Sequence, residues 1–396
     1  MAFILSMRNL TIAYTLSFLS RCWFWLGIWI FYYLRFTDYA GIGFLEAVMI
    51  TTLTVGEIPT GAIADILGKK VAVILAFLLG GLGNLIMAIA PNYWILVVSI
   101  MMMTLGSAFY SGSLEALVYD SLKQANTSHL YQKVIGRMTS MQNLGMVFSG
   151  IVGGYLYKWH VSLPFLFVAS AYLVGLILSF WLIEPIIDTE KYSWTRFIHR
   201  NAEGFKQLFA NKKMGILVIA LLIPGAFMVA TQNVLDDATA VELGFSSVQL
   251  GIFASILAIF GIVVSEKTEW LSNKLHTTRL YGGSVIIYAF TLLLIPKAMF
   301  LSGAILLLVR YGTQTFFDNY ISIKINAVIS SKYRATTLST FSLLRNIPYV
   351  LTATFMGIYM NFYTAKIFSL YFGIIFLLCI VGFYGVRMIL SNSLRE

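Results

Sequence analysis

Charged residues are scarce in this chain. Only 11% of its 396 residues are Asp, Glu, Lys or Arg, whereas a soluble domain has about 25%. Apolar residues make up 59%, compared with about 45–50% in a soluble domain. This composition excludes a soluble globular protein with a large core, and the long uncharged stretches indicate a polytopic membrane protein.

Cysteine and catalytic motifs are also lacking. Cys22 and Cys379 both fall in apolar stretches, so the chain has neither a disulfide framework nor a cysteine metal motif. The sequence contains no Gly-x-x-x-x-Gly-Lys-Ser/Thr loop, no nucleophile elbow and no metal-ligand cluster. We therefore expect neither enzyme activity nor a cofactor or metal, and ATP is not the expected energy source.

The apolar stretches predict transmembrane helices. They run for 18 residues or more, whereas barrel strands would alternate apolar and polar residues over about ten positions. A helix also satisfies its own backbone hydrogen bonds in lipid. Turn signals and charges divide the chain into twelve spans, at about 10–34, 42–65, 71–90, 94–120, 136–157, 163–183, 214–236, 247–266, 279–296, 299–323, 336–360 and 366–389. The predicted fold is an all-α polytopic membrane protein, with the N-terminal segment as an uncleaved first helix.

Positive charge predicts the orientation. The formal charge of +10 is spread between the apolar stretches and forms no patch, so we expect no nucleic-acid partner. With the N-terminus inside the cell, the inner segments hold 20 Lys and Arg residues and the outer loops hold 4. This bias predicts that both termini are cytoplasmic.

One long polar connection, 184–213, separates six spans from six. Apolar and aromatic residues recur in it at helical spacing, which favours an amphipathic helix on the inner membrane surface over a plain charged linker. We expect a six-helix bundle over 1–183 and a second one over 214–396.

A repeated pattern supports two related halves. Asp120 and Arg137 flank the junction of spans four and five, and Asp318 and Arg334 flank the junction of spans ten and eleven. The equivalent positions predict a parallel internal repeat. We expect two equivalent ion pairs on the cytoplasmic side, Asp120 with Arg137 and Asp318 with Arg334. They would act either as a gate or as static pairs that hold the fold.

The stretch "GAIADILGKK" ends the second span. Gly61, Asp65, Gly68, Lys69 and Lys70 match the G-x-x-x-D-x-x-G-[RK]-[RK] signature of the major facilitator superfamily, between spans two and three. With its twelve spans and central connection, the whole chain resembles a transporter of that superfamily. The resemblance implies two pseudo-symmetric six-helix bundles, with the Asp65 motif as a cytoplasmic gate. The alternative is that these residues only mark the membrane interface.

Two further elements depart from that superfamily's drug/proton antiporters. In "SGIVGG", Gly150 stands where those antiporters have proline, and Met102 stands where many proton-coupled members have arginine. The segments "SGSLEALVYDSL" and "RATTLS" nevertheless resemble a bacterial branch related to multidrug exporters.

Arg21, Glu57 and Glu115 are three of the charged residues inside the predicted spans of the first half. An ionised side chain in the membrane costs from about 2.5 kcal/mol upward unless it is paired or faces water. We expect these residues to form a charge network that carries protons, with Glu115 favoured as the titrating residue. The alternative is a purely structural pair between Arg21 and one of the two acids.

The second half contributes polar candidates for a substrate cavity, namely Gln232, Asn233, Arg310, Arg345 and Asn346. Its two arginines would suit an anionic or zwitterionic substrate, or they would pair with acids or carbonyls. Asp236 and Asp237 are expected to be solvated near the outer end of the seventh span.

These patterns predict a secondary transporter of the bacterial inner membrane. The favoured hypothesis is proton-driven export of small, partly hydrophobic compounds by a monomer in the lipid bilayer, with the proton gradient as its energy source. An importer of a small anionic or zwitterionic metabolite is the first alternative. A transport-inactive scaffold or receptor is the second.

Overall fold

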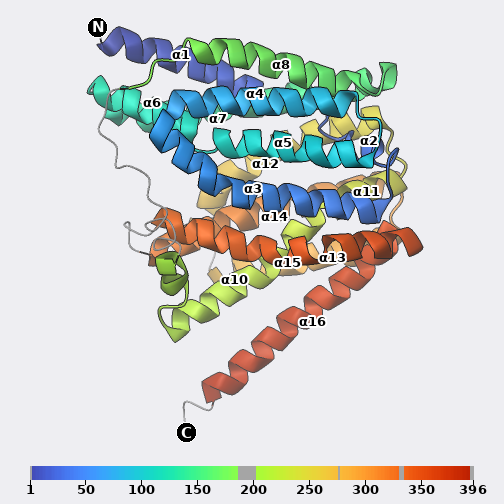
Figure 1. Cartoon of the computed structure of the whole chain (residues 1–396). Coiled ribbons are helices and arrows are strands. Elements are labelled where there is room, and N and C mark those ends of the chain that lie inside the picture. The colour runs from blue at the N-terminus through green and yellow to red at the C-terminus, as the bar shows by residue number, and fades with distance from the viewer. Residues whose placement is uncertain (1, 186–201, 275–276, 330–333, 393–396) are drawn as a thin grey trace. The chain divides into compact units, whose positions relative to one another are not determined.

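Every regular element in the described part of the chain is a helix (Figure 1). The computed structural model describes residues 2–185, 202–274, 277–329 and 334–392. The all-α prediction is therefore confirmed. Most of the predicted amphipathic linker helix, up to residue 201, lies outside the described residues, and residues 202–208 are helical.

Besides the helical residues 202–208, the described ranges contain fifteen α-helices and three short helical turns. The helices are α1 (Ala2–Ser20), α2 (Trp29–Tyr33), α3 (Tyr39–Leu67), α4 (Lys69–Ala88), α5 (Tyr93–Tyr110), α6 (Ser113–Gln124), α7 (Tyr131–Trp159), α8 (Leu163–Phe180), α10 (Lys212–Ala230), α11 (Asp236–Glu242), α12 (Ser247–Lys274), α13 (Thr277–Leu294), α14 (Phe300–Val328), α15 (Arg334–Phe362) and α16 (Ala365–Asn392). The turns are the 3₁₀ turns η1 (Ser128–Leu130) and η3 (Ile295–Lys297) and the π-helical turn η2 (Thr231–Leu235).

Nine helical segments within the described residues are long and apolar enough to cross a membrane. They correspond to nine of the twelve predicted spans. The other three predicted spans, the first, fifth and eleventh, correspond to α1 with α2, to α7 and to α15. Helices α7 and α15 contain no stretch of 18 residues as apolar as those in the nine, and the first span is interrupted.

Contacts divide the helices into two compact units. Unit 1 comprises Met1–Thr37, Ala47–Phe197 and Ser246–Ile259, and unit 2 comprises Asp38–Glu46, Ile198–Phe245 and Phe260–Glu396. The start of α3 therefore belongs to unit 2 and the start of α12 belongs to unit 1. The predicted boundaries of the two six-helix bundles stay a prediction.

In unit 1, α4 lies between α5 and α8, and α1 packs along α7 and α8 (Figure 1). Leu16, Val73, Phe77 and Leu117 are buried in the core between these helices. Asn9 adds polar contacts, because its Nδ2 donates to Ser121 Oγ at 2.9 Å and to the Ile183 carbonyl at 2.8 Å.

The first predicted span, at about 10–34, is not one continuous helix. Helix α1 ends at Ser20, and irregular backbone follows up to α2. Gly27 has φ +78° in this break, a conformation that glycine adopts without a Cβ penalty. Non-helical backbone at membrane depth is tolerated where protein covers it, and α7 does so here. Helix α7 passes so close that a Cβ on Gly153 would lie 1.9 Å from the carbonyl oxygen of Phe24.

In unit 2, α13 packs along α14 and α16, and α10 packs along α15 (Figure 1). Its fully buried large side chains include Tyr288, Phe317, Tyr349 and Phe376. The first residues of α3 join this unit at the end of α15, where the Tyr39 N–H donates to Asn361 Oδ1 at 3.0 Å.

We predict that Gly153→Ala destabilises the protein. The added methyl group collides with the Phe24 carbonyl, and overpacking of this kind costs about 1–3 kcal/mol. Thermal unfolding of the purified protein in detergent should show a lower midpoint for this variant. Gly136→Ala on the same helix is the matched control, since Gly136 is exposed and a Cβ there would meet nothing within 4 Å. Equal midpoints for the two variants would contradict the packing described here.

Candidate functional site

Arg310 on α14 is the largest fully buried side chain in the described residues, with 0% of its surface exposed. Its Nη1 donates to Asp236 Oδ1 at 2.6 Å, and its Nε and Nη2 donate to the side chain and carbonyl oxygens of Thr291, each at 3.1 Å. Every guanidinium nitrogen therefore has a partner. The prediction that Asp236 is solvated is wrong, because this acid neutralises the buried arginine.

A chain of hydrogen bonds extends this ion pair. Gln314 Nε2 donates to Thr231 Oγ1 at 2.6 Å, and the Tyr288 hydroxyl lies 3.1 Å from the same oxygen. Thr231 begins the π-helical turn η2, which leads directly into Asp236 and Asp237. Turns of this type occur frequently at functional sites. The seventh predicted span thus carries a local irregularity where its acids lie.

A second ion pair joins Arg345 on α15 to Asp318 on α14. It is more accessible than the first, because 20% of the Arg345 side chain and 41% of the Asp318 side chain are exposed. Sequence reasoning paired Asp318 with Arg334 instead. Arg334 begins α15, but its side chain lies outside the described residues, and the partner found for Asp318 is Arg345.

The remaining candidates for a substrate cavity lie on α15 and in the π-helical turn. Gln232 is exposed and Asn346 is half-buried. Asn233 donates to the Val229 carbonyl of its own helix at 2.8 Å. Both arginines among the cavity candidates are thus paired with acids, which the sequence left open.

In unit 1, the residues predicted to form a gate lie at the junction of α3 and α4. Lys69 forms an ion pair with Asp120, which lies near the C-terminal end of α6. The expected pair of Asp120 with Arg137 is not found, since Arg137 is exposed on α7 and the acid's partner among the described residues is Lys69. Asp65 is exposed at the end of α3, and a Cβ on Gly61 would meet nothing within 4 Å.

Glu184 completes this junction and was missed in the sequence. Its carboxylate accepts the backbone N–H groups of Lys69 at 2.9 Å and Lys70 at 2.6 Å, so it caps the N-terminus of α4. Gly68, at φ +100°, makes the turn that precedes this helix. The only signal in the sequence was an acid directly after the sixth span.

The structure does not join the three charged residues predicted to form a network in the first half. The Arg21 guanidinium lies over the ring of Trp23, 4.4 Å from its centroid. Glu57 and Glu115 are both exposed, on α3 and on the first turn of α6. Among the described residues, no ion pair links either acid to Arg21.

A different acid, Glu46, is buried, whereas Glu57 and Glu115 are not. Glu46 on α3 is 7% exposed and belongs to unit 2. The sequence signal was a single glutamate in the apolar stretch "GFLEAVMI", and the predicted charge network did not include it.

We predict that Asp236→Asn destabilises the protein more than Asp318→Asn does. Removing Asp236 leaves Arg310 buried without a counter-charge, and breaking a buried pair costs about 3–5 kcal/mol. The Arg345–Asp318 pair is partly exposed, so water compensates part of the loss there. Thermal unfolding of the two variants in the same detergent checks the order, and an inverted order would contradict this assignment.

Sequence comparisons identify relatives. A sequence model of the Major Facilitator Superfamily matches residues 10–353. "Multidrug resistance protein 1" of Bacillus subtilis (strain 168) is 24% identical over 244 residues, which are 60% of each chain. "Quinolone resistance protein NorA" of Staphylococcus aureus is 23% identical over 202 residues, 51% of this chain and 50% of that protein. The matched region thus spans less than two thirds of these relatives.

Solved structures match over nearly the full length. The crystal structure of the nucleoside transporter NupG has a TM-score of 0.79 and 17% identity, covering 96% of this chain and 98% of its own. A POT family transporter in complex with 5-aminolevulinic acid has a TM-score of 0.74 and 13% identity, with 98% and 97% covered. At these identities the likeness shows the fold. The match of the sequence model over residues 10–353 shows that this chain belongs to the Major Facilitator Superfamily, a superfamily of membrane transporters.

Proposed function

We propose that this protein exports small, partly hydrophobic compounds in exchange for protons. The observation that carries the proposal is the pairing of both mid-span arginines of unit 2: Arg310 with Asp236 and Arg345 with Asp318. Each positive charge that would attract an anionic substrate is already neutralised by an aspartate. This arrangement favours substrates that are neutral or cationic, and two of the matched relatives are named as multidrug and quinolone resistance proteins.

The proposed mechanism is alternating access driven by the proton gradient. Since the sequence has no phosphate-binding loop, we take an ion gradient rather than ATP as the energy source. We propose that the protein acts as a monomer in the bacterial cytoplasmic membrane. The charge bias supports an orientation with both termini inside the cell.

The junction of α3 and α4 is the proposed gate. In unit 1, the ion pair between Lys69 and Asp120 joins the start of α4 to α6. Glu184, which follows α8, caps the N-terminus of α4. This junction would move as a rigid piece. Asp65 and Gly61 at the end of α3 would then provide the contact that forms in one state and breaks in the other.

Import of a small anionic or zwitterionic metabolite is the second candidate. It requires an arginine to exchange its aspartate for the carboxylate of the substrate. Arg345 is the residue suited to this, because its pair with Asp318 is partly exposed, whereas Arg310 is fully enclosed. Arg345→Gln would then abolish uptake.

We predict that energised inverted vesicles containing this protein release protons from their lumen when an exported substrate is added. A pH-sensitive dye reports this as fluorescence recovery, tested across lipophilic cations, antibiotics, sugars and organic anions. The expected responders are lipophilic cations or antibiotics, and vesicles without the protein are the control. A response to organic anions alone, lost in Arg345→Gln, would replace export with the second candidate. Silence across the panel, with folded protein in the vesicles, would favour an importer or a sodium-coupled carrier.

A further inference from the structure

We propose that Asp318 binds the positive charge of an exported organic cation, and that Arg345 occupies this acid when no such cation is bound. This role rests on the proposed function and gives it a recognition residue in unit 2. Arg345 then determines the specificity of the site, because a substrate cation must compete with a guanidinium that belongs to the protein itself.

Asp318 is a partly exposed acid inside a membrane-spanning segment. It lies on α14, eight positions before the end of the apolar segment Phe300–Asn326, or about 12 Å from that end at ~1.5 Å per residue. Its side chain is 41% exposed. An ionised side chain within a span faces the interior of its bundle or a water-filled space, because lipid does not solvate it. Water, and an organic cation dissolved in it, therefore reaches this carboxylate.

Three helices of unit 2 meet at the ion pair. Arg345 extends from α15 to α14, where its Nη1 donates to Asp318 Oδ1. Its aliphatic stem passes α10 at Gly225, where a Cβ would lie 2.8 Å from Arg345 Cδ and 3.6 Å from Ile321 Cδ1 of α14. A side chain at position 225 would displace the arginine, so the glycine on α10 allows the pair to form.

The pair leaves hydrogen-bonding capacity unused on both residues. Within the described ranges, the Asp318 carboxylate has no second hydrogen-bond partner, although an ionised carboxylate has about four lone-pair sites. Arg345 Nε is buried and has no partner either. Arg310 differs, because its nitrogens are all bonded to Asp236 or Thr291 and its surface is fully enclosed. Of these two ion pairs, Arg345–Asp318 is the one that a ligand can enter.

The exposure of the two partners favours a cation as that ligand. The side chain of Asp318 is 41% exposed and that of Arg345 is 20% exposed, so the acid presents more of its surface. A partly exposed ion pair also holds its partners weakly. An incoming cation can therefore contact the carboxylate, either beside the arginine or in its place.

Competition from Arg345 also explains why the cation would be lipophilic. The guanidinium repels every second positive charge at this acid, which acts against all cations alike. An inorganic cation has no apolar surface with which to offset that repulsion. An organic cation gains free energy by burying its apolar body. The pair thus selects lipophilic cations over the potassium and sodium ions of the medium.

Two ions of equal shape and opposite charge test the site without a proton gradient. Tetraphenylphosphonium and tetraphenylborate are dialysed to equilibrium against the full-length protein in detergent. We expect Asp318→Asn to weaken tetraphenylphosphonium binding about tenfold or more, because the counter-charge is lost. Arg345→Gln removes the competing cation, so we expect it to bind tetraphenylphosphonium about tenfold more tightly and tetraphenylborate less tightly. A gain of affinity cannot result from misfolding.

Two further variants separate the charge of Arg345 from its position. Arg345→Lys keeps the positive charge, so its affinity for tetraphenylphosphonium should stay close to that of the parent. Gly225→Ala keeps both charges and displaces the arginine stem, so it should raise the affinity, although less than Arg345→Gln does. Gly215→Ala on the same helix is the matched control, because a Cβ there meets only an ordinary contact with Phe209 at 3.6 Å.

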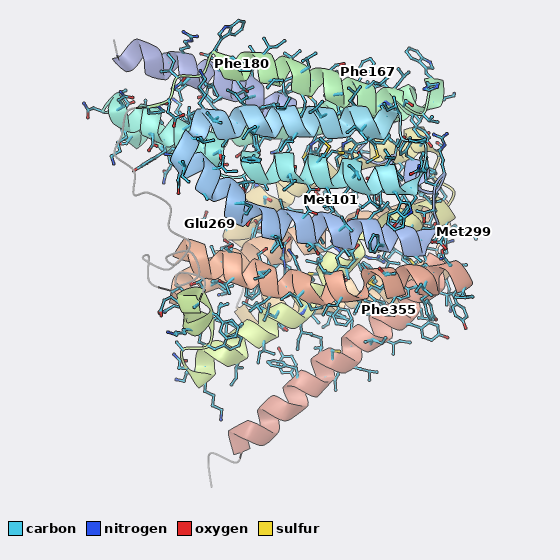
Figure 2. All side chains as sticks on the ribbon, viewed as in Figure 1. Met101, Phe167, Phe180, Glu269, Met299 and Phe355 are labelled. Carbon is cyan, nitrogen blue, oxygen red and sulfur yellow. The ribbon has the colours of Figure 1, made fainter. Side chains whose placement is uncertain are left out.

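An exposed acid elsewhere in unit 2 controls for the loss of negative charge. Glu269 lies on α12 and is exposed (Figure 2). Glu269→Gln changes the net charge by the same amount as Asp318→Asn, and we expect it to bind both ions as the parent does. Thermal unfolding of every variant in the same detergent shows whether the protein is folded.

Three results would overturn the assignment. They are no binding of tetraphenylphosphonium by the parent, equal affinities in the parent and Asp318→Asn, and weaker binding of tetraphenylphosphonium in Arg345→Gln. The vesicle assay is independent of them. Proton movement driven by tetraphenylphosphonium, with unchanged binding in Asp318→Asn, would keep the proposed function and remove this site. The expected changes in binding without any proton movement would keep the site and remove the proposed function.

Discussion

The structure depends on one constraint, which is that charge inside the hydrocarbon must be neutralised by the protein. Arg310 shows this most clearly: a fully buried guanidinium with Asp236 on one nitrogen and Thr291 on the other two. The helix that carries Asp236 contains a π-helical turn directly before it. We interpret the turn as the backbone adjustment that brings the acid to the arginine.

The same constraint applies to helix ends. The first N–H groups of a helix have no partner inside it, and they bear partial positive charge. Glu184 satisfies them for α4 and Glu242 satisfies them for α16, in both cases by accepting two consecutive backbone N–H groups. Acids that look like loop residues in the sequence therefore hold helices of the two units in place.

Close approach of backbones is the other basis of the fold. Helix associations in membranes rely on small residues, because lipid tails are as apolar as leucine side chains. The broken first span is possible for this reason, since Gly153 of α7 lets the chain at Phe24 pass within contact distance and cover the irregular segment. The glycines of "SGIVGG", read at first as an incomplete antiporter signature, thus have a packing role in unit 1.

Length, apolar content and charge spacing in the sequence were sufficient to predict an all-α polytopic membrane protein, because lipid allows few ways to bury a backbone. The signature from Gly61 to Lys70 was sufficient to identify the family. Only the tertiary structure decided which acid pairs with which basic residue and which acids are buried. Asp120 pairs with Lys69 and Asp318 with Arg345, and Glu46 is buried while Glu57 and Glu115 are exposed. Periodicity reports which residues lie on a helix, but the rotation and packing of that helix against others determine which charges meet.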